Sequence, residues 1–425
     1  MTRATLQDDA RGKAADSLPH GNRPHENLGT FEGAKSDSSA RVHSFPWAAL
    51  LTMALMGFLL IATETMPAGL LPQLAAGLDI TEGTAGQFVS AYALGTVVAA
   101  MPAAAMTRGM RRKPVFVIGI LGFLAANLVT AFSTDIVLSL GARLLAGAFS
   151  GLLWGMLAGY ARRITAPEHA GRALSVASLG TPVGLAVGTP FGSWLGTTLD
   201  WRWSFGVLSI LTVLTVLLAV FLVPDAPGQR ATTRVPLVRV LRIPGVAVVL
   251  AVIVTWMLGH NILYTYIGSY LHTAGLPLPV VVALVVFGAA AIAGIAITGA
   301  VIDKGLRRLV LLSLGAFIAA GVIFIVGHAS VAAIVTAIVL WGIAFGGAAA
   351  QLQTAISAAS GDNADVANAM LGVAFNLAIF AAGVGGAVVI SNVDGLVLPA
   401  VMAGLAAIAL IIAAARGEGG SRRHL

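Results

Sequence analysis

The sequence predicts an all-α membrane protein with twelve transmembrane helices in two pseudo-repeated six-helix bundles. Of its 425 residues, 58% are hydrophobic and only 10% are charged, with a mean hydropathy of +0.91, whereas soluble domains carry roughly 25% charged residues. The apolar residues form continuous runs of about 20, the length a helix needs to cross a ~30 Å hydrocarbon layer. These runs lack the alternation of barrel strands, so the spans are predicted to be helices.

Twelve apolar segments define the predicted spans, and one long polar stretch divides them six plus six. The segments cover residues 46–73, 85–107, 114–132, 136–161, 172–198, 203–223, 244–271, 279–302, 309–327, 330–358, 364–392 and 395–415. The stretch 224–243 contains three prolines and four arginines and reads as a linker. We therefore expect bundles at 46–223 and 244–415, with polar tails at 1–45 and 416–425. The composition of the first tail predicts disorder and does not fit a signal peptide.

The distribution of Lys and Arg predicts the orientation. With twelve spans both termini lie on one side, and 23 of the 25 basic residues fall on that side; only Arg143 and Arg202 do not. Basic loops are retained in the cytoplasm. We therefore expect a multi-pass protein of the inner (plasma) membrane with both termini and the linker cytoplasmic.

Several function classes are excluded or disfavoured by composition. The chain has no cysteine, so thiolate chemistry and cysteine metal sites are excluded. The net charge of +7 follows the topology, so no nucleic-acid partner is expected. No Gly-x-x-x-x-Gly-Lys-Ser/Thr or His-Glu-x-x-His sequence is present, and we expect no enzyme activity, cofactor or metal.

The two halves repeat a short basic loop at a lag of 196 residues. Gly109, Arg111 and Arg112 superpose on Gly305, Arg307 and Arg308. Parallel repeats of this kind are one plan of transporters that bind substrate between their halves. Since each chain would contain both halves of such a cavity, a monomer is expected.

The second of these loops resembles the signature of the major facilitator superfamily. That signature reads Gly-x-x-x-Asp-Arg-x-Gly-Arg-Arg, and residues 299–308 read GAVIDKGLRR, which keeps Asp303, Arg307 and Arg308. The copy at 103–112 has Thr107 at the position of the aspartate. The resemblance implies a twelve-helix transporter with a cytoplasmic latch at Asp303, Arg307 and Arg308, a latch that is absent or rebuilt in the first half.

Span five is similar to the glycine-proline motif of the antiporter branch of this family. Its small residues recur every fourth position, and they are Gly180, Gly184, Gly188, Gly192 and Gly196, with Pro190 between them. Such spacing gives a smooth helix face, and the proline favours a bend. The resemblance implies gating at Gly184, Gly188 and Pro190, although close packing alone would select the same glycines.

Glu64 is the acidic residue that lies well inside a predicted span. A carboxylate at membrane depth is costly unless it is protonated, paired or hydrated, so such an acid is a functional candidate. Arg143 lies at comparable depth in span four, about 12 Å from its outer end against about 18 Å for Glu64 at 1.5 Å per residue. We expect this pair to couple protons to transport. The alternatives are a permanent structural pair, or an Arg143 that is bonded only to carbonyls of the first helix.

Polar and aromatic residues inside other spans are candidates for binding a substrate. The expected set is Tyr92, Asn261, Tyr264, Gln351 and Asn376. Amides and hydroxyls orient a ligand and aromatic rings supply contact area, but single residues of this kind also join helices to one another. His260, near the counterpart of Glu64 in the second half, either titrates or packs as a neutral ring.

Together these features predict a proton-coupled exporter of small amphipathic compounds such as drugs, working by alternating access in the lipid bilayer. The alternative of the same fold is an exporter or importer of sugars or metabolites, because fold does not fix the substrate.

Overall fold

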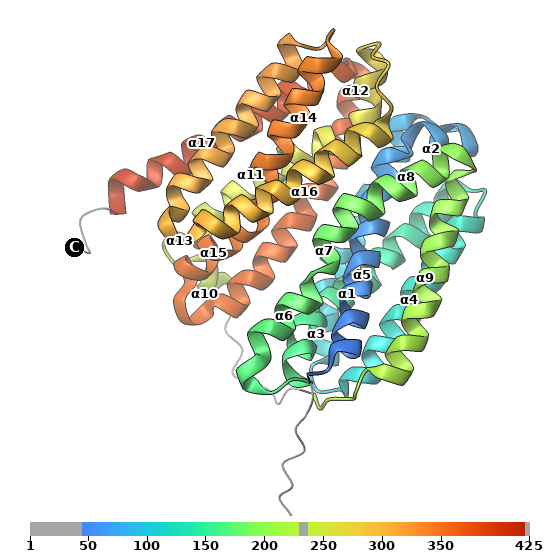
Figure 1. The fold of residues 1–425 in the computed structure, drawn as a ribbon, viewed down its shortest axis with the longest axis vertical. Coiled ribbons are helices and arrows are strands. Elements are labelled where there is room, and N and C mark those ends of the chain that lie inside the picture. The colour runs from blue at the N-terminus through green and yellow to red at the C-terminus, as the bar shows by residue number, and fades with distance from the viewer. Residues whose placement is uncertain (1–44, 229–236, 421–425) are drawn as a thin grey trace, which may run out of the picture. The chain divides into compact units, whose positions relative to one another are not determined.

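The computed structural model describes residues 45–228 and 237–420, and every regular element in these ranges is helical. The tail predicted at 1–45 lies almost entirely outside the described residues, as does the middle of the predicted linker. Helices of the first half run from blue to green in Figure 1 and those of the second half from yellow to red.

The first half contains nine helices among its described residues. They are α1 (Trp47–Thr65), α2 (Leu71–Leu78), α3 (Glu82–Thr107), α4 (Arg112–Phe132), α5 (Ile136–Arg163), α6 (Ala170–Ser178), α7 (Gly180–Val183), α8 (Thr189–Thr198) and α9 (Trp201–Leu222). A 3₁₀ turn (Met66–Gly69) joins α1 to α2, and a π-helical turn (Gly184–Gly188) joins α7 to α8. Both joins therefore lie within predicted spans one and five.

The second half contains eight helices among its described residues. They are α10 (Leu237–Leu241), α11 (Val246–Thr265), α12 (Ile267–Thr273), α13 (Val280–Val326), α14 (Val331–Gly346), α15 (Ala348–Ser360), α16 (Ala364–Asn392) and α17 (Leu398–Gly420). The breaks at Thr65 in α1 and Thr265 in α11 lie 200 residues apart, so spans one and seven share a broken form.

Eleven helical segments of the described chain are long and apolar enough to cross a membrane. One of them, α13, has 47 residues, which corresponds to about 70 Å and twice the thickness of a bilayer. Its backbone is non-helical at Gly305, inside the basic loop 303–308. The two parts of α13 match predicted spans eight and nine, and the all-helical twelve-span class is confirmed.

Acidic side chains cap the N-termini of several helices on one side of the molecule. We call this side the distal side, because it lies away from the two ends of the described chain. The side chain of Asp135 accepts from the N–H of Leu138 at 2.7 Å at the start of α5. Asp200 accepts from the N–H of Arg202 at the start of α9, and Asp394 accepts from the N–H of Leu396 in the 3₁₀ turn before α17. A carboxylate is favourable at a helix N-terminus because it satisfies free N–H groups. The opposite side, where the described chain begins and ends, is called the terminal side.

The two halves contact each other through the distal parts of their helices. Gly83 of α3 faces Ser391 of α16, and Gly288 of α13 faces Ala186. Near the terminal side, by contrast, a Cβ added at Gly299 or Gly372 would meet nothing within 4 Å. The glycine contacts named here thus join the halves in the distal parts of their helices.

Candidate functional site

Glu64 lies on the last turn of α1, where the first span breaks. The helix ends at Thr65, and Pro67, which has no N–H to donate, lies in the 3₁₀ turn that follows. Glu64 is buried, with 7% of the residue exposed. The break thus places a carboxyl group in the protein interior at a point where the helix is interrupted.

Arg143 of α5 lies close to Glu64 and is fully buried. Its Nε donates to the carbonyl of Phe88 at 3.0 Å, and its Nη2 donates to the carbonyl of Thr63 at 3.0 Å. The guanidinium carbon lies 4.6 Å from the ring centroid of Tyr92, a distance at which cation–π attraction is effective. Arg143 therefore joins α1, α3 and α5, and its bond to Thr63 is the one expected of a helix-one clamp.

Glu64 and Arg143 influence each other without forming an ion pair. Their charges are electrostatically coupled, but no nitrogen–oxygen distance of 4 Å or less joins them in the described structure. The Nη1 atom of Arg143 is buried and has no hydrogen-bond partner. Arg143 therefore keeps one donor that a direct contact with Glu64 would satisfy.

The glycine face of span five packs along α1 and the turn that follows it. Its contacts advance by four residues on both segments, and they are Gly180 with Ala54, Gly184 with Phe58, Gly188 with Ala62, Gly192 with Met66 and Gly196 with Leu70. An added Cβ at Gly188 would come within 2.8 Å of the Cβ of Ala62, which is closer than real Cβ contacts. Pro190 lies in the first turn of α8, two residues after the π-helical turn ends at Gly188, so the helix is irregular where its glycine face fits the helix that carries Glu64.

Three hydroxyl groups meet one residue beyond Glu64 and connect the halves. The hydroxyl of Thr65 is hydrogen-bonded to that of Thr189 in α8, and both lie beside the hydroxyl of Tyr264 in α11. Sequence reasoning selected Tyr264 but missed the two threonines, because threonine is common in membrane helices and nothing in its local pattern marks it.

Of the other residues predicted to bind substrate, Tyr92 lies beside the charged pair, whereas Asn261, Asn376 and Gln351 bond to groups of the second half. Tyr92 donates to the carbonyl of Leu60 at 3.1 Å and belongs to the Arg143 cluster. The amides of Asn261 and Asn376 donate one turn back along their own helices, to Met257 and Gly372. Gln351 donates to Thr298 and Ser313, both at 3.1 Å, so it joins helices of the second half.

His260 is buried in an aromatic cluster of the second half. Its Nδ1 accepts from the indole N–H of Trp341 at 3.1 Å, and its ring stacks on Phe345 with centroids 3.4 Å apart. The hydrogen bond assigns the ring proton of a neutral imidazole to Nε2. The described contacts are therefore those of a packed, neutral histidine.

The predicted latch residues lie in the loop within α13. Arg307 donates to the carbonyl of Ala414 in α17 at 3.0 Å, which ties the loop to the last helix. Neither Asp303 nor Arg308 takes part in the two ion pairs found among the described residues.

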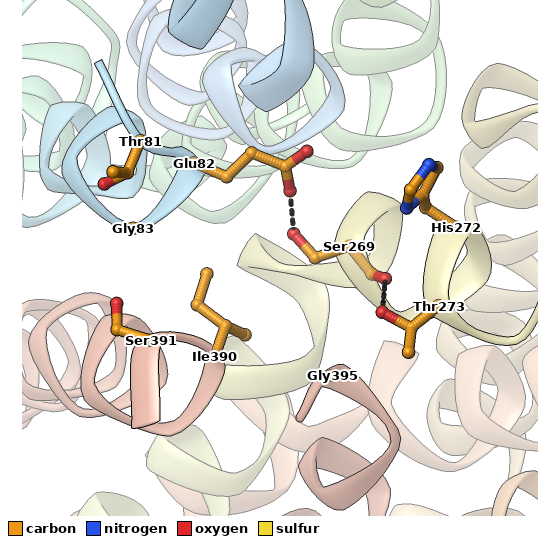
Figure 2. Close-up of a pocket in the computed structure, with 9 residues that line it drawn as sticks. All are labelled: Thr81, Glu82, Gly83, Ser269, His272, Thr273, Ile390, Ser391 and Gly395. Carbon is orange, nitrogen blue, oxygen red and sulfur yellow. Dashed lines mark hydrogen bonds between the residues drawn. The ribbon is translucent and has the colours of Figure 1, made fainter. Parts of the chain in front are cut away.

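A polar pocket of about 430 Å³ opens on the distal side between the two halves (Figure 2). Its lining residues are Thr81, Glu82, Gly83, Ser269, His272, Thr273, Ile390, Ser391 and Gly395. The hydroxyl of Ser269 donates to the carboxylate of Glu82 across this pocket. Deeper in the same seam, Gln87 donates to the carbonyl of Gly383 at 3.2 Å. These contacts close the distal side and were not predicted from the sequence.

Comparison with known proteins gives one family match and several relatives. A family model described as Major Facilitator Superfamily matches residues 53–383. Probable sugar efflux transporters of Helicobacter pylori strains G27 and P12 are each 24% identical over 343 residues, covering 80% of this chain and 88% of the relative. A chloramphenicol resistance protein of Streptomyces lividans is 34% identical over 251 residues, covering 57% of this chain and 63% of that protein.

Proposed function

Because the chain belongs to the Major Facilitator Superfamily, a family of membrane transporters, we propose that it exports small amphipathic compounds in exchange for protons by alternating access. The observation that carries this proposal is a buried carboxyl group, Glu64, that has no ion-pair partner among the described residues and lies beside a buried arginine. Such a group is costly when ionised and inexpensive when protonated. It is therefore suited to load and release a proton.

In this proposal, a proton and the substrate compete for the site at Glu64. A proton that enters down its gradient neutralises Glu64, and its release to the cytoplasm leaves a carboxylate that Arg143 stabilises and that a substrate can approach. Each charge that crosses the membrane contributes about 2.3 kcal/mol per 100 mV. In the conformation described here the halves meet distally, which supports a state closed to the outside.

The basic loops support the proposed orientation. The terminal side carries Arg108, Arg111, Arg112, Lys113 and the basic loop 303–308, which supports a cytoplasmic location by the positive-inside rule. We accordingly place the protein in the inner membrane, with both termini cytoplasmic, and expect one chain to suffice for transport.

The relatives bear on the class of substrate. The chloramphenicol resistance protein favours export of a drug-like compound, whereas the sugar efflux transporters favour export of sugars as the second candidate.

Reconstitution tests the proposal. Purified protein is placed in vesicles that contain a pH dye, and a panel of cationic drugs, neutral drugs and sugars is applied, with Glu64→Gln as the control. We expect ligand-triggered proton movement that Glu64→Gln abolishes. Ligand flux without proton movement in the unmodified protein would contradict antiport and reduce Glu64 to a binding or structural residue.

A further inference from the structure

A small cavity of about 120 Å³ lies at the terminal-side ends of α3 and α5, beside the first residue of α4. Its polar lining is formed by Thr107, Arg108 and Arg112. The remaining lining is apolar and consists of Ala104, Leu152, Gly155 and Met156. The volume is several times the ~30 Å³ share of a water molecule in the liquid, so a small polyatomic group fits.

Arg112 is a buried cation that lacks a counter-ion in the described structure. It is 8% exposed, and its Nη2 donates to the carbonyl of Arg108 at 3.0 Å. The charged side chains that act on it most strongly are the guanidiniums of Arg163 and Arg108. The described ion pairs involve other arginines. A buried charge that faces like charges is costly unless an anion compensates it.

The nearby carboxylate of Asp225 is already paired with a different arginine, Arg111. Asp225, which follows α9, is ion-paired with Arg111 and accepts from the backbone N–H of Lys113 at 3.0 Å and of Ala226 at 2.8 Å. The hydrogen bond of Arg112 to this segment is made by its backbone N–H, which donates to the carbonyl of Ala226 at 2.9 Å. Its side chain therefore remains available to the cavity.

We propose that this cavity binds a phosphate group, held by the side chains of Arg112 and Arg108 with the hydroxyl of Thr107 beside them. Guanidinium groups match the geometry of phosphate oxygens, and two guanidiniums with no carboxylate select an anion. The phosphate is either the headgroup of an anionic lipid, with the apolar wall against its acyl chains, or a free phosphate from solution. Basic pockets between membrane helices are known to bind lipid headgroups.

Thermal unfolding of the delipidated, purified protein tests this site. The probes are dioleoyl-phosphatidylglycerol, dioleoylglycerol as the same lipid without phosphate, inorganic phosphate, and sodium gluconate at equal ionic strength. We expect a phosphate-bearing probe to raise the melting temperature and Arg112→Met to weaken its apparent affinity about tenfold or more. Arg239→Met, which removes an exposed charge in α10, should respond like the unmodified protein.

A second variant keeps the test decisive if Arg112→Met fails to fold. Thr107→Asp supplies a carboxylate inside the cavity, so it should raise the melting temperature without any probe and abolish the response to phosphate. A response to phosphatidylglycerol alone assigns the site to a lipid headgroup, and a response to inorganic phosphate assigns it to a free anion. Equal responses to dioleoylglycerol or gluconate, or an unaltered response in Thr107→Asp, would overturn the proposal.

Discussion

The two halves repeat one architecture but differ in what they bury at the break of their first helix. Near the break in α1 the first half buries Glu64 and Arg143, whereas the second half, near the break in α11, buries His260 hydrogen-bonded to Trp341. The first pair consists of two ionisable side chains, of which Arg143 has a buried Nη1 without a hydrogen-bond partner. The second pair is neutral, hydrogen-bonded and enclosed in an aromatic cluster. Similar helix packing thus supports a titratable site in one half and an apolar wall in the other.

The loops on the terminal side differ in a related way. In the first half, where Thr107 replaces the family aspartate, Asp225 from beyond α9 pairs with Arg111. The segment that carries Asp225 is also held by Tyr160, whose hydroxyl donates to the carbonyl of Pro224 at 2.9 Å. In the second half the loop is tied by Arg307 to α17. In the first half, the ion pair between Asp225 and Arg111 therefore supplies the carboxylate that the family motif would place at position 107.

The largest contrast is expected between Arg143→Met and His260→Phe. Removing Arg143 takes away the side-chain donors to the carbonyls of Thr63 and Phe88 and leaves Glu64 without a nearby cation. Breaking a buried charged network of this kind costs about 3–5 kcal/mol. We expect loss of transport in vesicles and a lower melting temperature. His260→Phe should retain proton coupling. Equal loss of coupling in both variants would remove the distinction between the halves.

Gly188→Leu tests whether the first half needs its close seam between span five and α1. A leucine there collides with Ala62 and Phe58, and overpacking of this kind costs about 1–3 kcal/mol. We expect the initial rate of transport to fall about tenfold or more. Gly141→Leu is the matched control, because an added Cβ at Gly141 meets nothing within 4 Å. Normal transport by Gly188→Leu at normal expression would contradict a gating role.

Asp225→Asn tests the ion pair between Asp225 and Arg111 in the first-half loop. The stability that this pair contributes should depend on pH. The N–H of Lys113, with that of Ala226 and the Arg111 side chain, holds the pKa of Asp225 below its usual range. Ionised Asp225 therefore stabilises the fold above its unfolded-state pKa of about 4, and this stabilisation is lost as the pH falls through the lower folded-state pKa. We expect Asp225→Asn to cost about 1 kcal/mol or less at neutral pH.

Melting temperatures measured from pH 7 downwards check the sign of this effect. The difference between Asp225→Asn and the unmodified protein should shrink as the pH falls below about 4. A difference that is constant with pH would show that the charge of Asp225 does not hold the segment.

Arg307→Gln, the counterpart in the second half, should have the smallest effect. Its hydrogen bond to the carbonyl of Ala414 is exposed to solvent, and such bonds contribute about 0.5 kcal/mol. Chemical or thermal unfolding should therefore barely distinguish this variant. A larger loss than in Asp225→Asn would reverse the ranking of the two loops.

Much of the fold could be predicted from the sequence because each span must be apolar over the thickness of the bilayer. The segments 136–161 and 364–392 fall within a few residues of α5 and α16. The break at Tyr266 was not predicted, since no proline marks it. The ring of Tyr266 packs directly against Gly86 and Gly386, where an added Cβ would collide with it, and its hydroxyl donates to the carbonyl of Gly383. Packing between distant helices, which no local pattern encodes, explains that break.

The candidate site was partly predictable for the same reason. Depth along each helix places Glu64 and Arg143 at similar levels, and the structure brings them close to each other. Whether they touch depends on side-chain geometry, and here Arg143 bonds to carbonyls instead. The pairing of Arg111 with Asp225 joins residues 114 positions apart, so no spacing in the sequence points to it.

The most direct test of the central proposal, that proton chemistry resides at Glu64, is proton release from purified protein in weakly buffered detergent when a transported ligand is added. At a pH where Glu64 is protonated, the unmodified protein and His260→Phe should release a proton on binding, and Glu64→Gln should bind the ligand without releasing one. Undiminished proton release from Glu64→Gln would contradict the proposal, because the proton would then come from another group.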